Sequence, residues 1–118
     1  MNIDYEALVP VALQALYPTA QERQDIEKQL SAYGIASFHQ EIPRVWLGIL
    51  YLASKAPENL AGFIALACAD YRDLLCAAEY PYTSRYWQLE KQNPKKYRKL
   101  QTREESEYIA WVESIRKA

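Results

Sequence analysis

The chain has 118 residues, half of them hydrophobic, with 14 Lys or Arg and 15 Asp or Glu. This length suits one folded unit with its own core, and a net charge of −1 provides no overall field that would attract nucleic acid or a membrane surface. Three glycines are too few for a turn-rich β protein, and the longest apolar stretches are too short to span a bilayer, so both of these classes are excluded.

The N-terminal third of the sequence predicts two helices. Apolar residues recur at helical spacing over residues 8–16, and Pro18 ends this run. Thr19 is followed three residues later by Glu22, which is the pattern of a capping box at the start of a second helix. The second helix is polar on most of its faces and therefore lies on the outside, and Gly34 provides its stop.

Two apolar helices follow and form the centre of the predicted fold. The first, about residues 41–54, is apolar on every side, which is typical of a helix surrounded by protein. The second continues from about residue 60 to Pro81, and we expect the two to form an antiparallel hairpin because only a few residues join them. One face of the second helix is small enough for another helix to approach closely, at Gly62, Ala65 and Ala69.

Four charged residues lie in the second central helix, among neighbours that are mostly apolar or small: Asp70, Arg72, Asp73 and Glu79. A charge near a core needs a partner, because desolvating it alone is costly. If the hairpin folds back midway, Arg44 comes level with the turn that contains Asp70. Glu41 then lies beside Arg72 or Asp73. We therefore predict that Arg44 pairs with Asp70 or Asp73.

Two interpretations of these charges remain open. They form either a structural network of ion pairs or a ligand site, composed of Glu41, Arg44, Asp70, Arg72, Asp73, Glu79 and Tyr80. A metal-dependent enzyme is a further interpretation, with ligands from His39, Glu41, Asp70 and Asp73. However, the helical di-metal pattern needs a His on each of two helices, and this chain has one His. We therefore expect no metal, no cofactor and no catalytic residue.

The two cysteines of the chain, Cys68 and Cys76, are eight residues apart. In one helix this spacing corresponds to roughly 12 Å along the axis, at about 1.5 Å per residue, which is too far for a disulfide. We expect small buried thiols in a reducing cytoplasm. The N-terminal sequence also has no basic-then-apolar leader pattern, so we expect a cytoplasmic protein.

The last third of the sequence differs from the rest in charge. Residues 85–118 contain nine Lys or Arg against five Asp or Glu, whereas residues 1–84 contain five against ten. We therefore predict a helical bundle core, residues 1–84, and a basic helical extension, residues 85–118, that docks on it. Asn93 and Pro94 open one helix of the extension, and a capping box at Thr102 starts another.

Two surface functions are open for the extension. Cations and aromatic side chains are interleaved as in surfaces that neutralise phosphates and stack on bases, at Arg85, Tyr86, Trp87, Lys91, Lys95, Lys96, Tyr97, Arg98 and Lys99. No nucleic-acid reader motif accompanies them, and a solvated helix face explains them more simply. Aromatic side chains also anchor protein interfaces, and candidates gather where core and extension meet, at Tyr80, Tyr82, Tyr86, Trp87 and Trp111.

The central part of the sequence also resembles a known family. The residues that carry the resemblance are Tyr33-Gly34, then Arg44-Val45, Leu47-Gly48-Ile49-Leu50 and Leu52-Ala53, then Asp70-Tyr71-Arg72-Asp73 and Ala78-Glu79-Tyr80-Pro81. In order and spacing they resemble a widespread family of small uncharacterised bacterial all-helical proteins, over residues 20–84. The resemblance implies an intracellular bacterial helical domain. It carries over no catalytic residue, because the family has no established activity.

Together these patterns predict an all-α, single-domain bundle of five or six helices around a central antiparallel hairpin, residues 41–80. We expect a cytoplasmic, non-catalytic protein-interaction or accessory module whose partner is another protein or a second copy of the chain. The alternative is a nucleic-acid-associated protein that uses residues 85–99, and the metal-dependent enzyme comes third. A membrane partner is not expected, because the basic stretch lacks a clean apolar face.

Overall fold

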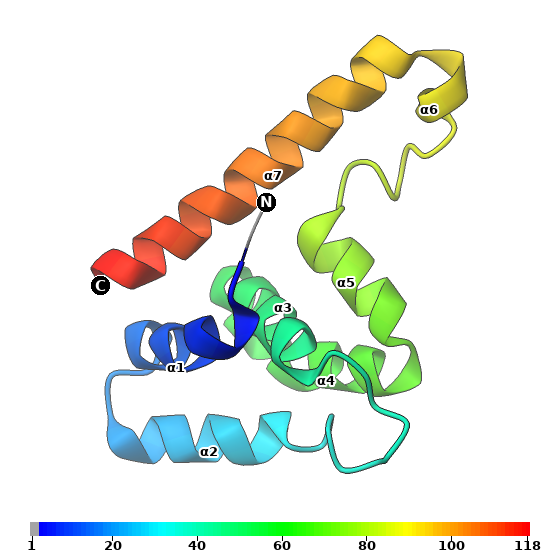
Figure 1. Cartoon of the computed structure of the whole chain (residues 1–118). Helices are drawn as coiled ribbons and strands as arrows, with labels where there is room; N and C mark the ends of the chain where they lie inside the picture. Colours follow the sequence, from blue (N-terminus) through cyan, green and yellow to red (C-terminus); the bar gives the residue numbers. More distant parts are fainter. Residues whose placement is uncertain (1–2) are drawn as a thin grey trace.

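The structure, a computed structural model, describes residues 3–118, and this part of the chain is α-helical with no strand (Figure 1). Its elements are α1 (Tyr5–Leu16), α2 (Ala20–Leu30), α3 (Ile42–Lys55), the 3-10 turn η1 (Pro57–Asn59), α4 (Leu60–Ala69), α5 (Tyr71–Glu79), α6 (Leu89–Gln92) and α7 (Pro94–Lys117). The predicted all-α, single-domain class is therefore confirmed. The described residues contain seven α-helices, more than the five or six expected.

The first two helices begin where side chains can cap them. Asp4 caps α1, and the Thr19 hydroxyl accepts a hydrogen bond from the backbone N–H of Glu22 at 3.1 Å, which confirms the predicted start of α2. The end of α2 is earlier than expected, at Leu30. Gly34 instead shapes the turn that follows, where its φ of +134° is accessible to glycine at little cost.

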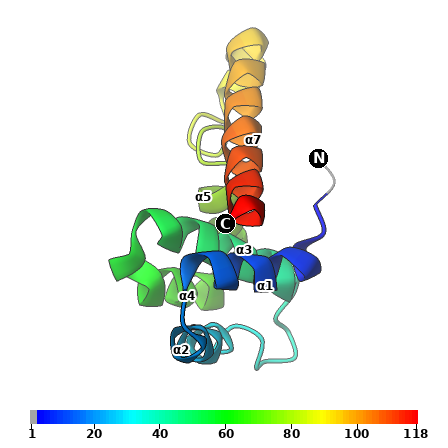
Figure 2. The same ribbon diagram turned by 90° about the vertical axis from the view of Figure 1, so that its left-hand side faces the viewer.

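Helix α3 is the centre of the fold. Its neighbours are α1, α4 and α5, and Figure 2 shows α3 between α1 and α4. The predicted helix surrounded by protein is confirmed by the buried residues Val45, Leu47, Gly48, Ile49, Leu50, Tyr51 and Ala53. Pro43 lies in the first turn, where its missing N–H disturbs no helical hydrogen bond. The short turn η1 then returns the chain antiparallel along α3 as α4.

The second central helix is not continuous, contrary to the prediction. The chain is extended at Asp70 (φ −159°, ψ 97°), which separates α4 from α5. The Asp70 carboxylate accepts a hydrogen bond from the backbone N–H of Arg72 at 3.0 Å and so caps α5. Aspartate competes with the helical backbone in this way, and the cap outweighs the apolar periodicity that continues across it. Helix α5 then packs against both α3 and α4.

The small-residue face of α4 contacts no helix, also contrary to the prediction. A Cβ atom built on Gly62 would meet no atom within 4 Å, and Ala65 and Ala69 are exposed. The close helix approach occurs instead at Gly48 of α3. A Cβ atom there would lie 3.1 Å from Leu74 and 3.3 Å from Ala78, both on α5.

Helix α7 is one helix of 24 residues, whereas the sequence predicted two. Thr102 does not start a new helix, because its hydroxyl donates to the backbone carbonyl of Arg98 one turn earlier, at 3.0 Å. Its C-terminal half packs on the core through the buried residues Tyr108, Val112 and Ile115. Its first turns project away from the core toward α6, which makes the molecule elongated, 49 × 33 × 26 Å (Figure 1).

Candidate functional site

Arg44 is the centre of a network of ion pairs. Its guanidinium donates to both carboxylate oxygens of Glu79, from Nε to Oε2 at 2.9 Å and from Nη2 to Oε1 at 2.7 Å. Its Nη1 donates to Oε1 of Glu41 at 3.0 Å. The Glu79 side chain is only 4 % exposed and that of Arg44 is 24 % exposed. The hydrogen bonds to Glu79 raise the pKa of Arg44 above its ordinary value.

The predicted pairing of Arg44 with Asp70 or Asp73 is wrong. Because a new helix begins after Asp70, the opposite end of α5, where Glu79 lies, reaches the first turn of α3. Asp70 is occupied as the cap of α5, and Asp73 is exposed in its first turn. No ion pair joins Arg72 to Glu41 among residues 3–118 either: Glu41 pairs with Arg44, and the exposed Arg72 guanidinium lies 5.9 Å from the ring centroid of Tyr71.

The predicted site residues therefore separate into two groups at opposite ends of α5. Asp70, Arg72 and Asp73 lie at its start. The other four residues meet at its end: Glu79 and Tyr80 from α5, and Glu41 and Arg44 from the start of α3. Only this second group forms a network of ion pairs.

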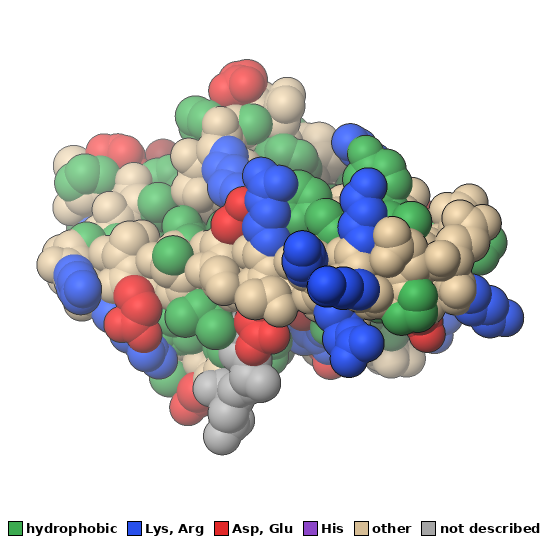
Figure 3. Space-filling model, turned by 90° about the horizontal axis from the view of Figure 1, so that it is seen from above, with side chains coloured by type: hydrophobic (Ala, Val, Ile, Leu, Met, Phe, Trp, Pro, Cys, Tyr) green, Lys and Arg blue, Asp and Glu red, His purple; other side chains and the backbone are tan. Residues whose placement is uncertain are grey.

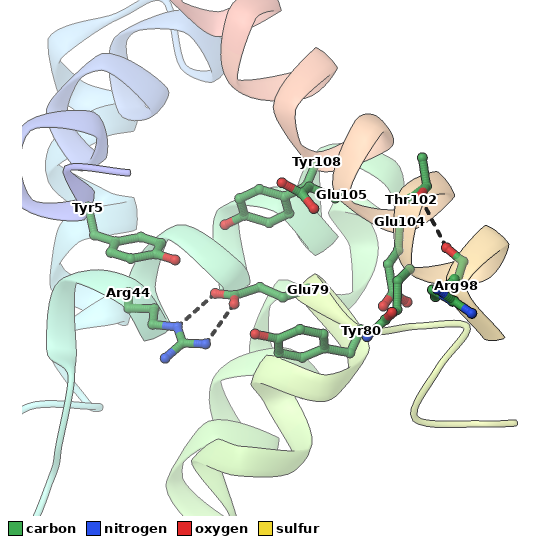
Figure 4. Close-up of a pocket in the computed structure, with 10 residues that line it drawn as sticks. Tyr5, Arg44, Glu79, Tyr80, Arg98, Thr102, Glu104, Glu105 and Tyr108 are labelled. Carbon is green, nitrogen blue, oxygen red and sulfur yellow. Dashed lines mark hydrogen bonds and ion pairs between the residues drawn. The ribbon is translucent and has the colours of Figure 1, made fainter. Parts of the chain in front are cut away.

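The Arg44 network borders a pocket of about 640 Å³ among α1, α3, α5 and α7 (Figure 4). This volume lies within the range of about 300–1,000 Å³ that is typical of small-molecule sites. Arg44, Glu79 and Tyr80 of this wall are among the predicted site residues. The remaining wall residues were not predicted for this site, and Arg98 was assigned to a separate basic surface: Tyr5 of α1 and Arg98, Gln101, Thr102, Glu104, Glu105 and Tyr108 of α7. Tyr108 shares an apolar stripe of α7 with Val112 and Ile115, and this spacing gives no sign that its hydroxyl lines a pocket.

The Tyr108 hydroxyl is the most unusual polar group in this pocket. The residue is 1 % exposed, and its hydroxyl has no hydrogen-bond partner among residues 3–118. Burial raises the pKa of Tyr108, and burial also raises that of Tyr5 on the opposite wall. Both phenols are protonated at neutral pH, as an ordinary tyrosine is, and can donate or accept hydrogen bonds.

Glu104 is a second buried carboxylate beside the pocket, 4 % exposed. Its Oε2 accepts hydrogen bonds from the backbone N–H groups of Tyr82 and Thr83, both at 3.1 Å. Its Oε1 accepts from the Thr83 hydroxyl at 2.6 Å. These three bonds tie the segment after α5 to the middle of α7. They depend on tertiary proximity, which local sequence periodicity does not report.

The predicted interface aromatics do not form one cluster. Trp87 is 64 % exposed and Tyr86 is 47 % exposed. Tyr82 instead donates from its hydroxyl to Glu107 at 2.8 Å. Trp111 packs its ring against Tyr51, with centroids 5.1 Å apart. Tyr86 and Trp87 are therefore available to a partner, whereas Tyr82 and Trp111 contribute to the packing of α7.

The cations of the extension are exposed and lie close together in the sequence. Between residues 91 and 103 the sequence contains no acidic residue, and six cations are exposed there: Lys91, Lys95, Lys96, Arg98, Lys99 and Arg103. Figure 3 shows Lys and Arg side chains gathered over the first half of α7. The last of the six, Arg103, forms an ion pair with Glu107 at 3.1 Å.

His39 organises a loop. Its Nδ1 accepts hydrogen bonds from the backbone N–H groups of Gly34, at 2.7 Å, and Ala36, at 3.3 Å, and its ring stacks on Tyr33 with centroids 4.4 Å apart. His39 and Asp70 do line one small pocket of about 270 Å³. However, no group of three or more His, Cys, Asp or Glu in residues 3–118 is placed to hold a metal ion.

The two cysteines are free thiols, and the prediction that both are buried is wrong for Cys68 and holds only in part for Cys76. Cys68 is exposed in the last turn of α4, next to the exposed Ala69. Cys76 is half-buried, and burial raises the pKa of its thiol.

Comparisons of the chain with models of known protein families, with curated proteins and with solved structures found no match. None of the helices in residues 3–118 combines the length and the apolar character that crossing a membrane requires. The class of protein that the fold and its surfaces define is thus a small all-α protein with a polar pocket and a basic, aromatic end.

Proposed function

We propose that this chain is a non-catalytic protein-interaction module that binds an acidic partner protein with the end of the molecule formed by residues 85–99. The single observation that supports this most strongly is the exposure of Trp87, 64 % of which is accessible beside a row of cations. Tryptophan anchors interfaces because it buries a large area on binding. Cations around it favour a partner with an acidic surface.

The start of α7 gives the cations of this surface an additional reason to bind an anion. The first turn of α7 contains Lys95 and Lys96 and no acidic residue. Cations at a helix N-terminus are unfavourable, because the unpaired N–H groups there already carry partial positive charge. Carboxylates of a partner would relieve this repulsion, and the neighbouring aromatic rings would add apolar contact.

Nucleic acid is the second candidate partner, favoured by the same run of cations without an intervening acidic residue between residues 91 and 103. A protein partner is favoured over it for two reasons. The net charge of the whole chain is −1, and acidic residues border the basic surface at Glu90, Glu105 and Glu107. The acidic part of the chain, residues 1–84, also makes a second copy a candidate partner.

A binding experiment with the full chain separates these partners. Two labelled ligands are titrated separately at several salt concentrations. One is an acidic helical peptide with Glu on one face and Leu on the other, and the second is a 20-nucleotide single strand. We expect the peptide to bind more tightly than the strand at physiological salt. Trp87→Ala and the double variant Lys95→Glu, Lys99→Glu should each weaken peptide binding at least tenfold. Lys117→Glu, a matched charge reversal at the other end of α7, should leave it unchanged.

The other outcomes are also informative. Tighter binding of the strand, with a steep loss of affinity as salt rises, would establish the second candidate instead. A dimer by sedimentation that Trp87→Ala dissociates would identify a second copy as the partner and keep the interaction function. If Trp87→Ala changes neither peptide binding nor self-association, the proposed function is overturned.

A further inference from the structure

We propose that the pocket among α1, α3, α5 and α7 binds a small organic cation, an amine in its ammonium form. This site shares Arg98 with the proposed partner surface at residues 85–99, but its other wall residues lie outside that surface and it does not depend on the proposed function. Three features of the pocket support such a ligand: the charges that line it, the tyrosine hydroxyls that point into it, and the buried hydroxyl that has no partner.

The charges that line the pocket favour a cation over an anion. Three carboxylates and two guanidiniums line it, and the Arg44 guanidinium is already shared between Glu41 and Glu79. Glu105 is exposed at the edge and takes part in none of the ion pairs of residues 3–118. The positive charge of Arg98 offsets only part of the carboxylate charge. A cation is therefore attracted to the pocket, and an anion is repelled.

Tyrosine hydroxyls surround the buried carboxylate at the base of the pocket. Figure 4 shows the hydroxyls of Tyr5, Tyr80 and Tyr108 pointing toward Glu79 from three sides. Phenol and carboxylate oxygens accept hydrogen bonds from N–H donors. Both phenols are neutral at pH 7 and offer an oxygen lone pair to a donor. An ammonium group placed among these oxygens would find several acceptors around one position.

The Tyr108 hydroxyl indicates that a ligand with a hydrogen-bond donor or acceptor occupies this pocket. Buried polar groups almost always have a hydrogen-bond partner, and each exception needs an explanation. This hydroxyl is buried, lines the pocket and has no partner among residues 3–118. An ammonium N–H would provide the partner. Phenylalanine would fill the same core position without the polar group, so packing alone does not require the tyrosine hydroxyl.

Three small molecules with the same four-carbon skeleton test which ligand charge the pocket prefers. The full chain is titrated at low ionic strength with 1,4-diaminobutane, 1,4-butanediol and succinate, which are a dication, a neutral diol and a dianion. Binding is measured by calorimetry, and the NMR signals that shift show where each probe binds. We expect the diamine to bind at least tenfold more tightly than the other two and to shift the signals of Tyr5, Tyr80 and Tyr108.

Two variants test the named groups, and one serves as control. Tyr108→Phe and Glu105→Gln should each weaken diamine binding at least threefold. Glu113→Gln removes the same charge from an exposed site of α7 outside the pocket and should leave binding unchanged. Tyr108→Phe should not lower the unfolding temperature, because the hydroxyl that it removes makes no hydrogen bond.

Several results would overturn the cation site. Succinate or the diol binding as tightly as the diamine would show that the pocket does not select a cation. Unchanged diamine affinity in Tyr108→Phe would remove the buried hydroxyl from the site. An equal loss of affinity in Glu113→Gln would mean that only the overall charge of α7 matters.

Discussion

Arg44 occupies a position where a cation is intrinsically unfavourable. It lies in the first turn of α3, where the helix dipole opposes positive charge. Two carboxylates compensate for this: Glu41, the residue before the helix, and Glu79 from α5. The dependence is mutual, since Glu79 is almost fully buried and Arg44 is its cationic partner. One bidentate pair thus connects the start of α3 to the end of α5.

A double-mutant cycle measures this dependence. Arg44→Met leaves the buried Glu79 carboxylate without its cation and should lower the free energy of unfolding by about 3 kcal/mol. Glu79→Met should cost less, because Arg44 keeps Glu41 and some solvent exposure. The double variant should be no less stable than Arg44→Met alone, as measured by urea denaturation. Strictly additive effects of the two substitutions would contradict the pairing.

The contact between Tyr82 and Glu107 predicts a dependence on pH. The hydrogen bond from Tyr82 lowers the pKa of Glu107 below its ordinary value of 4.5. A carboxyl whose pKa is lowered by folding stabilises the folded state above that ordinary value, and this contribution is lost as the pH falls through the lower folded pKa. Tyr82→Phe should therefore cost about 0.5–1 kcal/mol at pH 7.

The same difference in stability should shrink as the pH falls below 4.5, because protonated Glu107 no longer binds the Tyr82 hydroxyl as an anion. Thermal unfolding of Tyr82→Phe and the unsubstituted chain at several pH values provides the measurement. Tyr86→Phe, which changes an exposed ring, is the matched control and should show no such trend. A difference that stays constant with pH would contradict the contact.

At the scale of elements, the packing of α5 on α3 depends on the absence of a side chain at Gly48. A Cβ atom there would lie 3.1 Å from Cδ1 of Leu74 and 3.3 Å from Cβ of Ala78. The first neighbour can move because it is the end of a flexible side chain, but the second is fixed to its backbone. Gly62 on α4 has open space instead.

Substitution of these two glycines should give opposite results. Gly62→Ala should stabilise the chain by about 0.5–1 kcal/mol, because alanine favours a helix and meets no neighbour. Gly48→Val should destabilise it by about 1–3 kcal/mol, because α5 must move away. Chemical denaturation of both variants is the measurement. Equal effects at the two positions would contradict the close approach of α3 and α5.

At the scale of the whole molecule, α7 is part of the same core as α1 and α3. Tyr108, Val112 and Ile115 are buried with residues of those helices. The Tyr108 ring also contacts Tyr51 of α3, with centroids 4.8 Å apart. We therefore expect the chain to unfold in one cooperative transition, with α7 included.

Two isoleucines of α7 test this expectation. Ile115→Ala should lower the free energy of unfolding by about 2–4 kcal/mol and shift the whole transition, because Ile115 lies in the core. Ile109→Ala, on the exposed side of the same helix, should change it by less than about 0.5 kcal/mol. Calorimetry distinguishes the outcomes. A separate early transition in Ile115→Ala would mean that residues 85–118 unfold on their own.

The candidate site was predicted only in part. The sequence identified Arg44 and Glu79 as charges that need partners, but it paired Arg44 with Asp70 or Asp73. That pairing assumed a continuous helix. Both the helical periodicity and the cap at Asp70 are present in the sequence, and periodicity alone does not tell which of the two prevails. The pocket was missed for a related reason, because its walls come from four helices that are distant in the chain.

The sequence by itself determined the features that depend on neighbours within one or two helical turns. These are the all-α class, the cap at Thr19 and the burial of α3. Only the tertiary structure decided the partner of Arg44, the burial of Glu104 and the position of the Tyr108 hydroxyl. The physical reason is that the break at Asp70 and the fusion of α7 into one helix set which distant residues meet. The spacing of residues within one helix carries no information about contacts between distant parts of the chain.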